Sequence, residues 1–152
     1  MLDSKDLSHL DLDDYLAGLI IDLKRGFIEI DRNISFQIKM ENISITVETA
    51  MPLGLVFIEL VINSIKHAFP DKKSGTIEVK LYSTPQKEII FEVSDNGIGF
   101  PEGFDIDRDT NLGLKTTIEL VKFQLNGTIH FESIKGVHCK IMIQNVIYKP
   151  RV

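Results

Sequence analysis

Apolar residues recur along this chain with two different periods, which divide it into expected helices and strands. Recurrence at every third or fourth position predicts an amphipathic helix, and strict alternation predicts a strand with one buried face. The expected helices cover residues 12–27, 53–69 and 114–125. The expected strands cover residues 35–41, 43–47, 76–81, 88–94, 128–133 and 137–144. This mixture, joined by short loops, is typical of an α/β domain.

Residues that cap helices and form turns support these boundaries. Asp11 can cap the first helix, whereas Pro52 suits the first turn of the second helix and Pro70 ends it. A turn at Glu41–Asn42 is expected to join the first two strands. A second turn at Lys135–Gly136 is expected to join the last two.

Composition and charge narrow the classes of protein to consider. The 152 residues are 43% hydrophobic and 26% charged, which is ordinary for one folded domain. We expect a leader or linker at residues 1–10, a single domain at 11–147 and a tail at 148–152. The formal charge of −5 argues against a nucleic-acid partner. The sequence has no apolar run long enough to span a membrane, so we expect no direct membrane contact. With one cysteine and no signal-peptide pattern, the chain is expected to be cytoplasmic.

A polar stripe on the second expected helix is the first sign of a binding site. Glu59, Asn63, Lys66 and His67 fall within an arc of about 100° on a helix that is otherwise mostly apolar. A solvated helix face is the plain explanation. The alternative is a ligand-facing stripe, because an amide oxygen suits Mg²⁺, whereas an ammonium and an imidazole suit phosphate oxygens. Together these residue types favour a site for a magnesium-bound nucleotide.

Two glycine-containing segments follow, one after a strand and one before a helix. The glycines in Asp95–Gly99 would let the main chain approach a ligand, although Asn-Gly is also a common turn. Asn111–Lys115 opens the last helix, where free N–H groups form an anion site. Lys115 is unfavourable near that helix start unless a negative group lies nearby. Neither segment matches a P-loop or a dinucleotide-binding fingerprint.

The order of these segments resembles a known family of ATP-binding domains. Glu59–Pro70 resembles the N box of histidine-kinase catalytic domains, Asp95–Gly99 their G1 box, and Leu112–Leu114 the core of their G2 box. The resemblance extends from about Leu10 to Ile143. It implies the Bergerat fold, the ATPase domain shared by gyrase, chaperone, histidine-kinase and mismatch-repair enzymes. That fold is a two-layer α/β (α+β) sandwich, in which about three helices cover one face of a mixed, mostly antiparallel sheet and a short lid covers ATP.

The resemblance implies roles for the polar stripe. Glu59 would act as the general base or orient the attacking group, and Asn63 would bind the Mg²⁺ that bridges the phosphates. Lys66 and His67 would reach phosphate oxygens, and Asp95 would accept a hydrogen bond from the adenine amino group. Phosphoryl transfer mainly requires positioning and charge neutralisation, so these groups suffice on the ATP side.

The resemblance also assigns the glycine segments to the nucleotide. Gly97 and Gly99 would let the main chain approach it, and residues 100–111 would form the lid. Phe100 and Phe104 are the aromatic candidates within the lid, and either could belong to the core instead. The remaining residues expected to hold the nucleotide are Asn111, Gly113, Leu114 and Lys115.

Three departures from the family pattern are visible. Asn111 stands where the Gly-Leu-Gly-Leu pattern has its first glycine, which predicts a less free lid hinge. Gly136–Val137 stands where the family often has Gly-Thr, which removes a hydroxyl that would support the Asp95 carboxylate. The helix at 12–27 contains no histidine that could accept a phosphoryl group. The chain therefore resembles the catalytic module alone.

The expected function is that of the ATP-binding catalytic domain of a two-component sensor histidine kinase, which uses ATP and Mg²⁺. Its partners would be a histidine-bearing dimerisation domain, joined in cis in the full-length kinase, and the receiver domain of a response regulator. It would work in the cytoplasm, alone or as part of a membrane-attached sensor. Two alternatives stay open: a stand-alone serine kinase of the anti-sigma-factor type, and a non-catalytic interaction module of the same fold.

Overall fold

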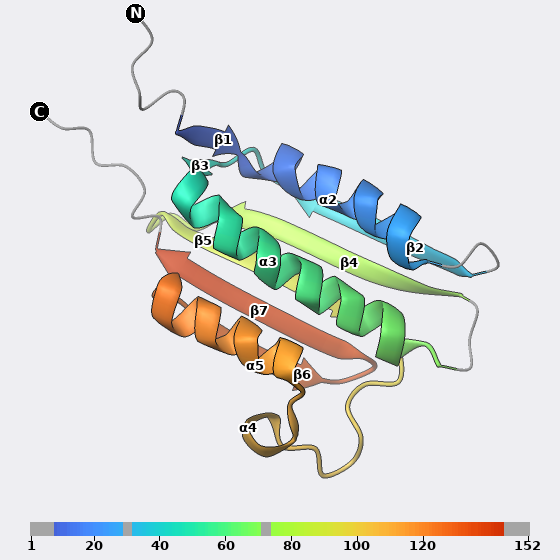
Figure 1. The fold of residues 1–152 in the computed structure, drawn as a ribbon. Coiled ribbons are helices and arrows are strands. Elements are labelled where there is room, and N and C mark those ends of the chain that lie inside the picture. Colours follow the sequence, from blue (N-terminus) through green and yellow to red (C-terminus); the bar gives the residue numbers. More distant parts are fainter. Residues whose placement is uncertain (1–7, 29–31, 71–73, 145–152) are drawn as a thin grey trace, which may run out of the picture.

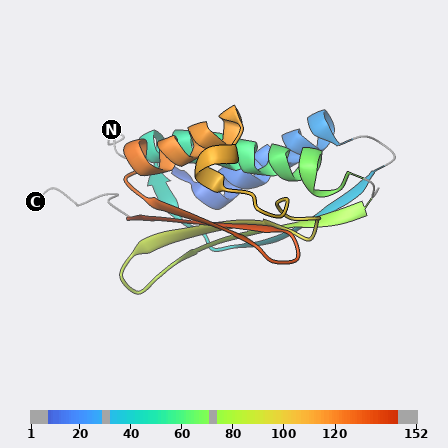
Figure 2. The ribbon, with the colours of Figure 1, turned by 90° about the horizontal axis from the view of Figure 1, so that it is seen from below.

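The computed structural model arranges helices on one face of a five-stranded sheet (Figure 1). It describes residues 8–28, 32–70 and 74–144. Viewed along the plane of the sheet, the described helices all lie on the same side (Figure 2). Buried apolar side chains from both layers fill the space between them. The predicted two-layer α/β sandwich is confirmed.

The sheet is mixed and mostly antiparallel, as predicted. Its strands, in spatial order, are β2 (Asn33–Met40), β4 (Ser74–Ser83), β5 (Glu88–Asp95), β7 (Val137–Gln144) and β6 (Thr128–Ser133). The β2–β4 pair is parallel, and the other neighbouring pairs are antiparallel. Positive φ angles at Lys135 (52°) and Gly136 (112°) close the predicted hairpin between β6 and β7.

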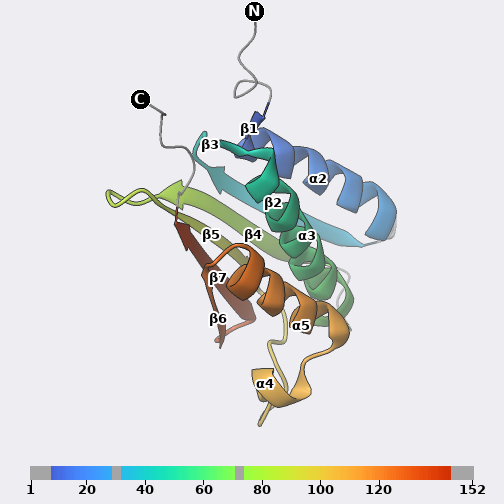
Figure 3. The same cartoon turned by 60° about the vertical axis from the view of Figure 1, so that its left-hand side comes forward.

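Three main helices form the covering layer, and two of them continue into a π-helical turn. Their bounds are α2 (Leu12–Phe27), α3 (Val47–Asn63) with η1 (Ser64–Ala68), and α5 (Leu112–Glu119) with η2 (Leu120–Gln124). Leu12, Leu16, Ile20 and Leu23 bury the apolar stripe of α2 against the core. A short helix, α4 (Ile106–Asp109), lies in the segment predicted as loop, near the start of α5 (Figure 3).

The predicted hairpin at Glu41–Asn42 is wrong, although both of its strands exist. β2 pairs with β4, whereas β3 (Ser44–Thr46) pairs with β1 (His9–Asp11) in a separate two-stranded sheet. The main-chain N–H of Leu12 donates to the carbonyl of Ile43 at 2.8 Å, which joins the start of α2 to this small sheet. Alternation shows which side chains face a core, but it does not show which strand is the neighbour.

Helix α3 begins at Val47, not at the predicted Pro52. Thr46 is its N-cap, and the Thr46 hydroxyl accepts a hydrogen bond from the N–H of Thr49 at 3.4 Å. Pro52 lies in the second turn, where its missing N–H removes one helical hydrogen bond while its ring is buried in the core. A threonine cap at the last residue of β3 therefore decides where the helix starts.

Helix α3 and η1 together form the central helix of the layer. Among the residues described, Val47–Ala68 is the one helical span long and apolar enough to cross a membrane, with a mean hydropathy of 1.4. Over its most apolar stretch, 56% of the residues are buried inside the fold. Phe57 packs edge-on against Phe91 of β5, with ring centroids 5.6 Å apart. Burial between the sheet and the flanking helices accounts for this hydropathy.

The end of η1 is held by an arginine that precedes β2. The Arg32 guanidinium donates to the carbonyl oxygens of Ile65 at 3.0 Å and Phe69 at 3.1 Å. Carbonyls at a helix C-terminus carry partial negative charge, which favours a cation there. Arg32 therefore fixes the end of the helix that carries the predicted polar stripe.

We expect Arg32→Ala to lower the free energy of unfolding by about 2 kcal/mol, because two carbonyls lose a charged donor. For a domain of this size, the thermal midpoint should fall by roughly 4–8 °C, which circular dichroism can measure. Arg25→Ala is the matched control, since Arg25 is exposed in the last turn of α2. Equal shifts in the two variants would contradict the role given to Arg32.

The face of the sheet away from the helices carries a hydrogen-bonded carboxylate. Glu92 of β5 accepts a hydrogen bond from the Tyr82 hydroxyl at 2.8 Å, and its other oxygen lies 2.6 Å from Nε2 of His138. Burial works against ionisation of this side chain, which is only 13% exposed. The hydrogen bonds from Tyr82 and His138, with the charges of His138 and Lys140, outweigh burial and lower the pKa of Glu92.

A carboxylate with a lowered pKa stabilises the fold above its unfolded-state pKa of about 4.3, and this contribution is lost as pH falls through the folded-state value. We therefore expect Glu92→Gln to reduce the free energy of unfolding in urea at pH 7. The difference from the parent protein should shrink progressively between pH 5 and pH 3. Glu132→Gln, at an exposed position on β6, is the control. A difference for Glu92→Gln that does not change with pH would refute this account.

Candidate functional site

A cavity of about 350 Å³ lies between the end of the central helix, the loop after β5 and the start of α5. The predicted site residues that line it are Asn63, His67, Asp95, Gly99, Asn111 and Leu114. Much of the remaining wall is apolar and includes Leu60, Val93, Ile98 and Cys139. Burial raises the pKa of the Cys139 thiol, which therefore stays neutral at pH 7. A largely apolar cavity with a few polar groups is typical of a small-molecule site.

Asp95 is buried at the end of β5, and three donors hold its carboxylate. Oδ1 accepts hydrogen bonds from the main-chain N–H of Gly97 at 3.0 Å and of Val137 at 3.2 Å. Oδ2 accepts a hydrogen bond from the Ser64 hydroxyl at 2.9 Å. The Gly136–Val137 departure removes a hydroxyl that the family pattern places beside this carboxylate, but the carboxylate keeps other donors. Ser64 supplies a hydroxyl, and Val137 contributes its main-chain N–H.

Glycines seat the loop after β5 against the rest of the protein. A Cβ on Gly97 would lie 2.2 Å from the carbonyl oxygen of Ala68, which also accepts a hydrogen bond from the N–H of Ile98 at 2.9 Å. A Cβ on Gly136 would lie 1.9 Å from the carbonyl oxygen of Asp95. Both contacts are with main chain, which cannot move aside as a side chain does. Contacts within the protein thus require glycine at these two positions, whatever ligand the cavity takes.

Glu59 and Gly113 meet where α5 begins beside the central helix. A Cβ on Gly113 would lie 2.5 Å from Oε2 of Glu59, so any larger residue would displace the carboxylate. The Glu59 carboxylate lies near the N-terminus of α5, where the helix dipole favours negative charge. Glu59 is half-buried and is not among the residues that line the cavity. It lies beside the polar end of the cavity, one turn from Asn63.

Asn63 and Asn111 join the two helices at the same end of the cavity. Nδ2 of Asn111 donates to Oδ1 of Asn63 at 3.3 Å. Oδ1 of Asn111 accepts a hydrogen bond from the N–H of Leu114 at 2.8 Å and so caps α5. Nδ2 of Asn63 is buried and has no hydrogen-bond partner among the described residues. The oxygen of Asn63 is therefore the amide atom directed toward Asn111.

Two predicted phosphate-binding lysines lie away from the cavity. Lys66 and Lys115 are exposed, and neither lines the cavity wall. Lys66 lies away from the cavity because it belongs to a π-helical turn. Such a turn has hydrogen bonds between residues i and i+5 and is wider than an α-helical turn. A wider turn keeps His67 beside Asn63 and carries Lys66 away from it. The arc calculated for an ideal α-helix therefore does not hold beyond Asn63.

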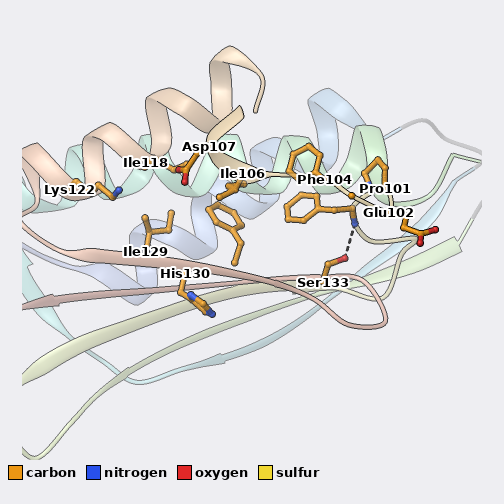
Figure 4. Close-up of a pocket in the computed structure, with 13 residues that line it drawn as sticks. Pro101, Glu102, Phe104, Ile106, Asp107, Ile118, Lys122, Ile129, His130 and Ser133 are labelled. Atoms are coloured by element: carbon orange, nitrogen blue, oxygen red, sulfur yellow. Dashed lines mark hydrogen bonds between the residues drawn. The ribbon is translucent and has the colours of Figure 1, made fainter. Parts of the chain in front are cut away.

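The predicted lid is anchored by an aromatic cluster. The rings of Phe100 and Phe104 stack with centroids 4.4 Å apart, and Phe131 of β6 lies 6.2 Å from Phe100. The N–H of Phe100 donates to the Ser133 hydroxyl at 2.8 Å (Figure 4). All three rings line the first cavity and also a second cavity of about 560 Å³. The second cavity, drawn in Figure 4, is bounded by the lid, α5, η2 and β6. A movement of the lid would consequently change both cavities.

Sequence reasoning missed Ser64, Val137 and Phe131. Ser64 lies on the core-facing side of the central helix, outside the polar stripe. A polar side chain on a buried face needs a hydrogen-bond partner, and that rule is the signal that could have found it. Val137 acts through its main-chain N–H, which no pattern of side chains reveals. Phe131 belongs to an alternating strand and gives no separate signal.

Comparison with known proteins matches this site to one family. A family model described as "Histidine kinase-, DNA gyrase B-, and HSP90-like ATPase" matches residues 48–146. The matched region contains the central helix, the loop after β5, the lid and α5. It therefore includes every residue predicted for the site.

Curated relatives match over part of their length. Blue-light-activated histidine kinase 2 of Erythrobacter litoralis (strain HTCC2594) is 30% identical over 89 residues, which cover 59% of this chain and 26% of that protein. Sensor histidine kinase PdtaS of Mycobacterium tuberculosis (strain ATCC 25618 / H37Rv) is 32% identical over 83 residues, which cover 54% of this chain and 16% of that protein. The chain thus matches about a quarter or less of each relative.

Solved structures show the same fold. The histidine kinase domain of an Erythrobacter litoralis blue-light activated histidine kinase is similar with a TM-score of 0.79 and 25% identity, covering 88% of this chain and 65% of that one. The catalytic domain of histidine kinase ThkA is similar with a TM-score of 0.72 and 17% identity, covering 90% of this chain and 95% of that one. The similarity in fold covers 88–90% of this chain.

We expect Ser64→Ala to lower the free energy of unfolding by about 1–3 kcal/mol, because a buried carboxylate oxygen loses its hydroxyl donor. Chemical denaturation followed by circular dichroism measures the change. Ser94→Ala is the matched control, since Ser94 precedes Asp95 on β5 but lies on the half-exposed side of the strand. If Ser64→Ala is no more destabilising than this control, Ser64 does not hold Asp95.

Proposed function

The chain belongs to the histidine kinase-, DNA gyrase B- and HSP90-like ATPase family, and on that premise we propose that it is the ATP-binding catalytic domain of a sensor histidine kinase. The domain binds ATP together with Mg²⁺. It transfers the γ-phosphoryl group to a histidine on a separate dimerisation domain. The observation that carries this proposal is the distribution of polar groups at two ends of one largely apolar cavity.

The Asp95 end of the cavity suits adenine. A carboxylate offers about four lone-pair directions, and the described hydrogen bonds from Gly97, Val137 and Ser64 occupy three. One acceptor direction on Oδ2 is left for an exocyclic amino group. Val93, Ile98 and Leu114 provide apolar contact for a flat base. Guanine presents a carbonyl oxygen where adenine has its amino group, so this end discriminates between the two bases.

The other end of the cavity suits a magnesium-bound phosphate chain. Mg²⁺ in nucleotide sites is commonly held by one or two protein groups, with phosphate oxygens and waters completing its shell. Oδ1 of Asn63 is such a ligand, and Glu59 lies one turn earlier on the same helix. Main-chain N–H groups at the start of α5 and the imidazole of His67 can donate to phosphate oxygens. When bound, Mg²⁺ neutralises charge on the phosphates, and Glu59 orients or deprotonates the attacking group.

We infer the acceptor and the further partners from the kind of protein that the relatives are named as. Two of them are named as histidine kinases, and the matched segment is a minor part of each. We place the acceptor histidine on a dimerisation domain joined to this one in the full-length kinase. A response-regulator receiver domain then takes the phosphoryl group, and the reaction takes place in the cytoplasm. The serine-kinase and interaction-module alternatives are not favoured, because the matching relatives are histidine kinases.

Nucleotide binding is the direct test. We expect Mg-ATP at about 100 times its Kd to stabilise the parent protein by about 2.7 kcal/mol, a rise in thermal midpoint of roughly 5–10 °C. Asn63→Ala should lose the part of this shift that depends on Mg²⁺, because a metal ligand is gone. Asn33→Ala, at an exposed position on β2, is the control and should keep the full shift. No shift at millimolar nucleotide would refute the proposal.

The transfer step is measured in the longest polypeptide that carries this segment, incubated with labelled ATP. Acid-labile, base-stable label on histidine is the expected product, and Asn63→Ala should abolish it. Acid-stable label on a serine of a separate protein would instead support the anti-sigma-factor type of kinase. Binding without transfer in any full-length protein would support an interaction module.

A further inference from the structure

We propose that Asn111 is a positioning residue for Asn63 and holds the Asn63 amide so that its oxygen faces the cation. This inference rests on the proposed function, because it assigns a task within the same Mg-nucleotide site. Asn111 is the last residue of the lid and the N-cap of α5. It therefore connects the proposed metal ligand to two elements that must be correctly placed around the phosphates.

The positioning depends on a chain of two hydrogen bonds with a fixed direction. The N–H of Leu114 can only donate, so it fixes the oxygen of the Asn111 amide at 2.8 Å. That leaves Nδ2 of Asn111, which can also only donate, directed at Asn63 at a distance of 3.3 Å. A donor there requires an acceptor opposite it. The Asn63 amide must therefore present its oxygen on this side.

The other side of the Asn63 amide does not set its orientation. Nδ2 of Asn63 is buried and finds no hydrogen-bond partner among the described residues. Rotating the amide by 180° would place two NH₂ groups against each other at Asn111 and leave the oxygen in the buried position without a donor there. Asn111 consequently contributes the described hydrogen bond that distinguishes the two orientations. An amide carbonyl has two lone pairs, so the bond from Asn111 still leaves one for Mg²⁺.

The backbone at this position does not require glycine. Asn111 has a φ of −76° and a ψ of 175°, an extended conformation that any residue can adopt. The departure from the Gly-Leu-Gly-Leu pattern therefore adds a side chain without backbone strain. Both polar atoms of that side chain are used, the oxygen for the helix cap and the nitrogen for Asn63. A residue that served only as a cap would need the oxygen alone.

Two substitutions separate the cap from the positioning role. Serine caps a helix about as well as asparagine, but it has no amide nitrogen to reach Asn63. Asn111→Ser should therefore keep the thermal midpoint of the nucleotide-free protein, whereas Asn111→Ala should lower it. The decisive quantity is the ratio of the ATP dissociation constant in EDTA to that in Mg²⁺, measured by calorimetry for the parent and both variants.

We expect this ratio to fall roughly 2- to 12-fold in Asn111→Ser, the effect of one ordinary hydrogen bond, because affinity in Mg²⁺ falls more than affinity in EDTA. Asn63→Ala defines the lower limit, at which Mg²⁺ no longer tightens binding. A parent-like ratio in Asn111→Ser would overturn the inference and leave Asn111 as a cap only. Loss of affinity in EDTA as much as in Mg²⁺ would also overturn it, because the effect would then not act through the metal ligand.

A second measurement does not depend on nucleotide. In the parent protein, the side-chain amide protons of Asn63 should give one sharp pair of NMR signals. In Asn111→Ser the pair should broaden or double, because both orientations become populated. An unchanged single pair would overturn the positioning role. Failure of the parent to bind nucleotide at all would instead refute the proposed function, and these signals would still decide whether Asn111 orients Asn63.

Discussion

Burial of the Asp95 carboxylate is the constraint on which the geometry of the site depends. A buried carboxylate without partners costs several kcal/mol, so the fold must bring donors to it. Those donors come from three places: the loop after β5, strand β7 and the π-helical turn η1. One carboxylate thus joins the sheet to the helical layer at one end of the cavity. Gly136 is required at the same point, because its main chain lies against that of Asp95.

The η1 turn connects the Asp95 carboxylate to the rest of the site, because hydrogen bonds fix the turn at both ends. Its first residue, Ser64, donates a hydrogen bond to Asp95, and the carbonyl of its last residue, Ala68, accepts one from the loop after β5. Arg32 donates hydrogen bonds to two carbonyl oxygens at the C-terminal end of the turn. Fixed at both ends, the turn keeps His67 on the cavity wall. The opposite end of the cavity depends on a different contact, the close approach of Gly113 to Glu59. The two ends are therefore set by separate interactions along one helix.

Most of the architecture could be predicted because hydrophobic period reports secondary structure and the exposed face directly. The predictions that failed share a physical cause. They concern which groups contact one another, and the spacing of apolar residues along the chain does not report contacts. β3 alternates as expected, yet its hydrogen-bonding neighbour is β1. The polar stripe predicts Asn63 and His67 at the cavity, but the position of Lys66 depends on a π-helical turn that no side-chain pattern announces. Ser64 was detectable only by asking what a polar group does on a buried helix face.

A departure from a family pattern is informative when the hydrogen bonds at that position are examined. Val137 lacks the hydroxyl expected beside Asp95, but its main-chain N–H and the Ser64 hydroxyl together satisfy the carboxylate. Asn111 replaces a glycine in a backbone conformation that does not need one, and its side chain forms two hydrogen bonds. In both cases the requirement is a donor or an acceptor at a certain place, and not a certain residue type. A motif compares residue types, so it counts Val137 and Asn111 as mismatches. The hydrogen bonds show that neither substitution leaves a required donor or acceptor missing.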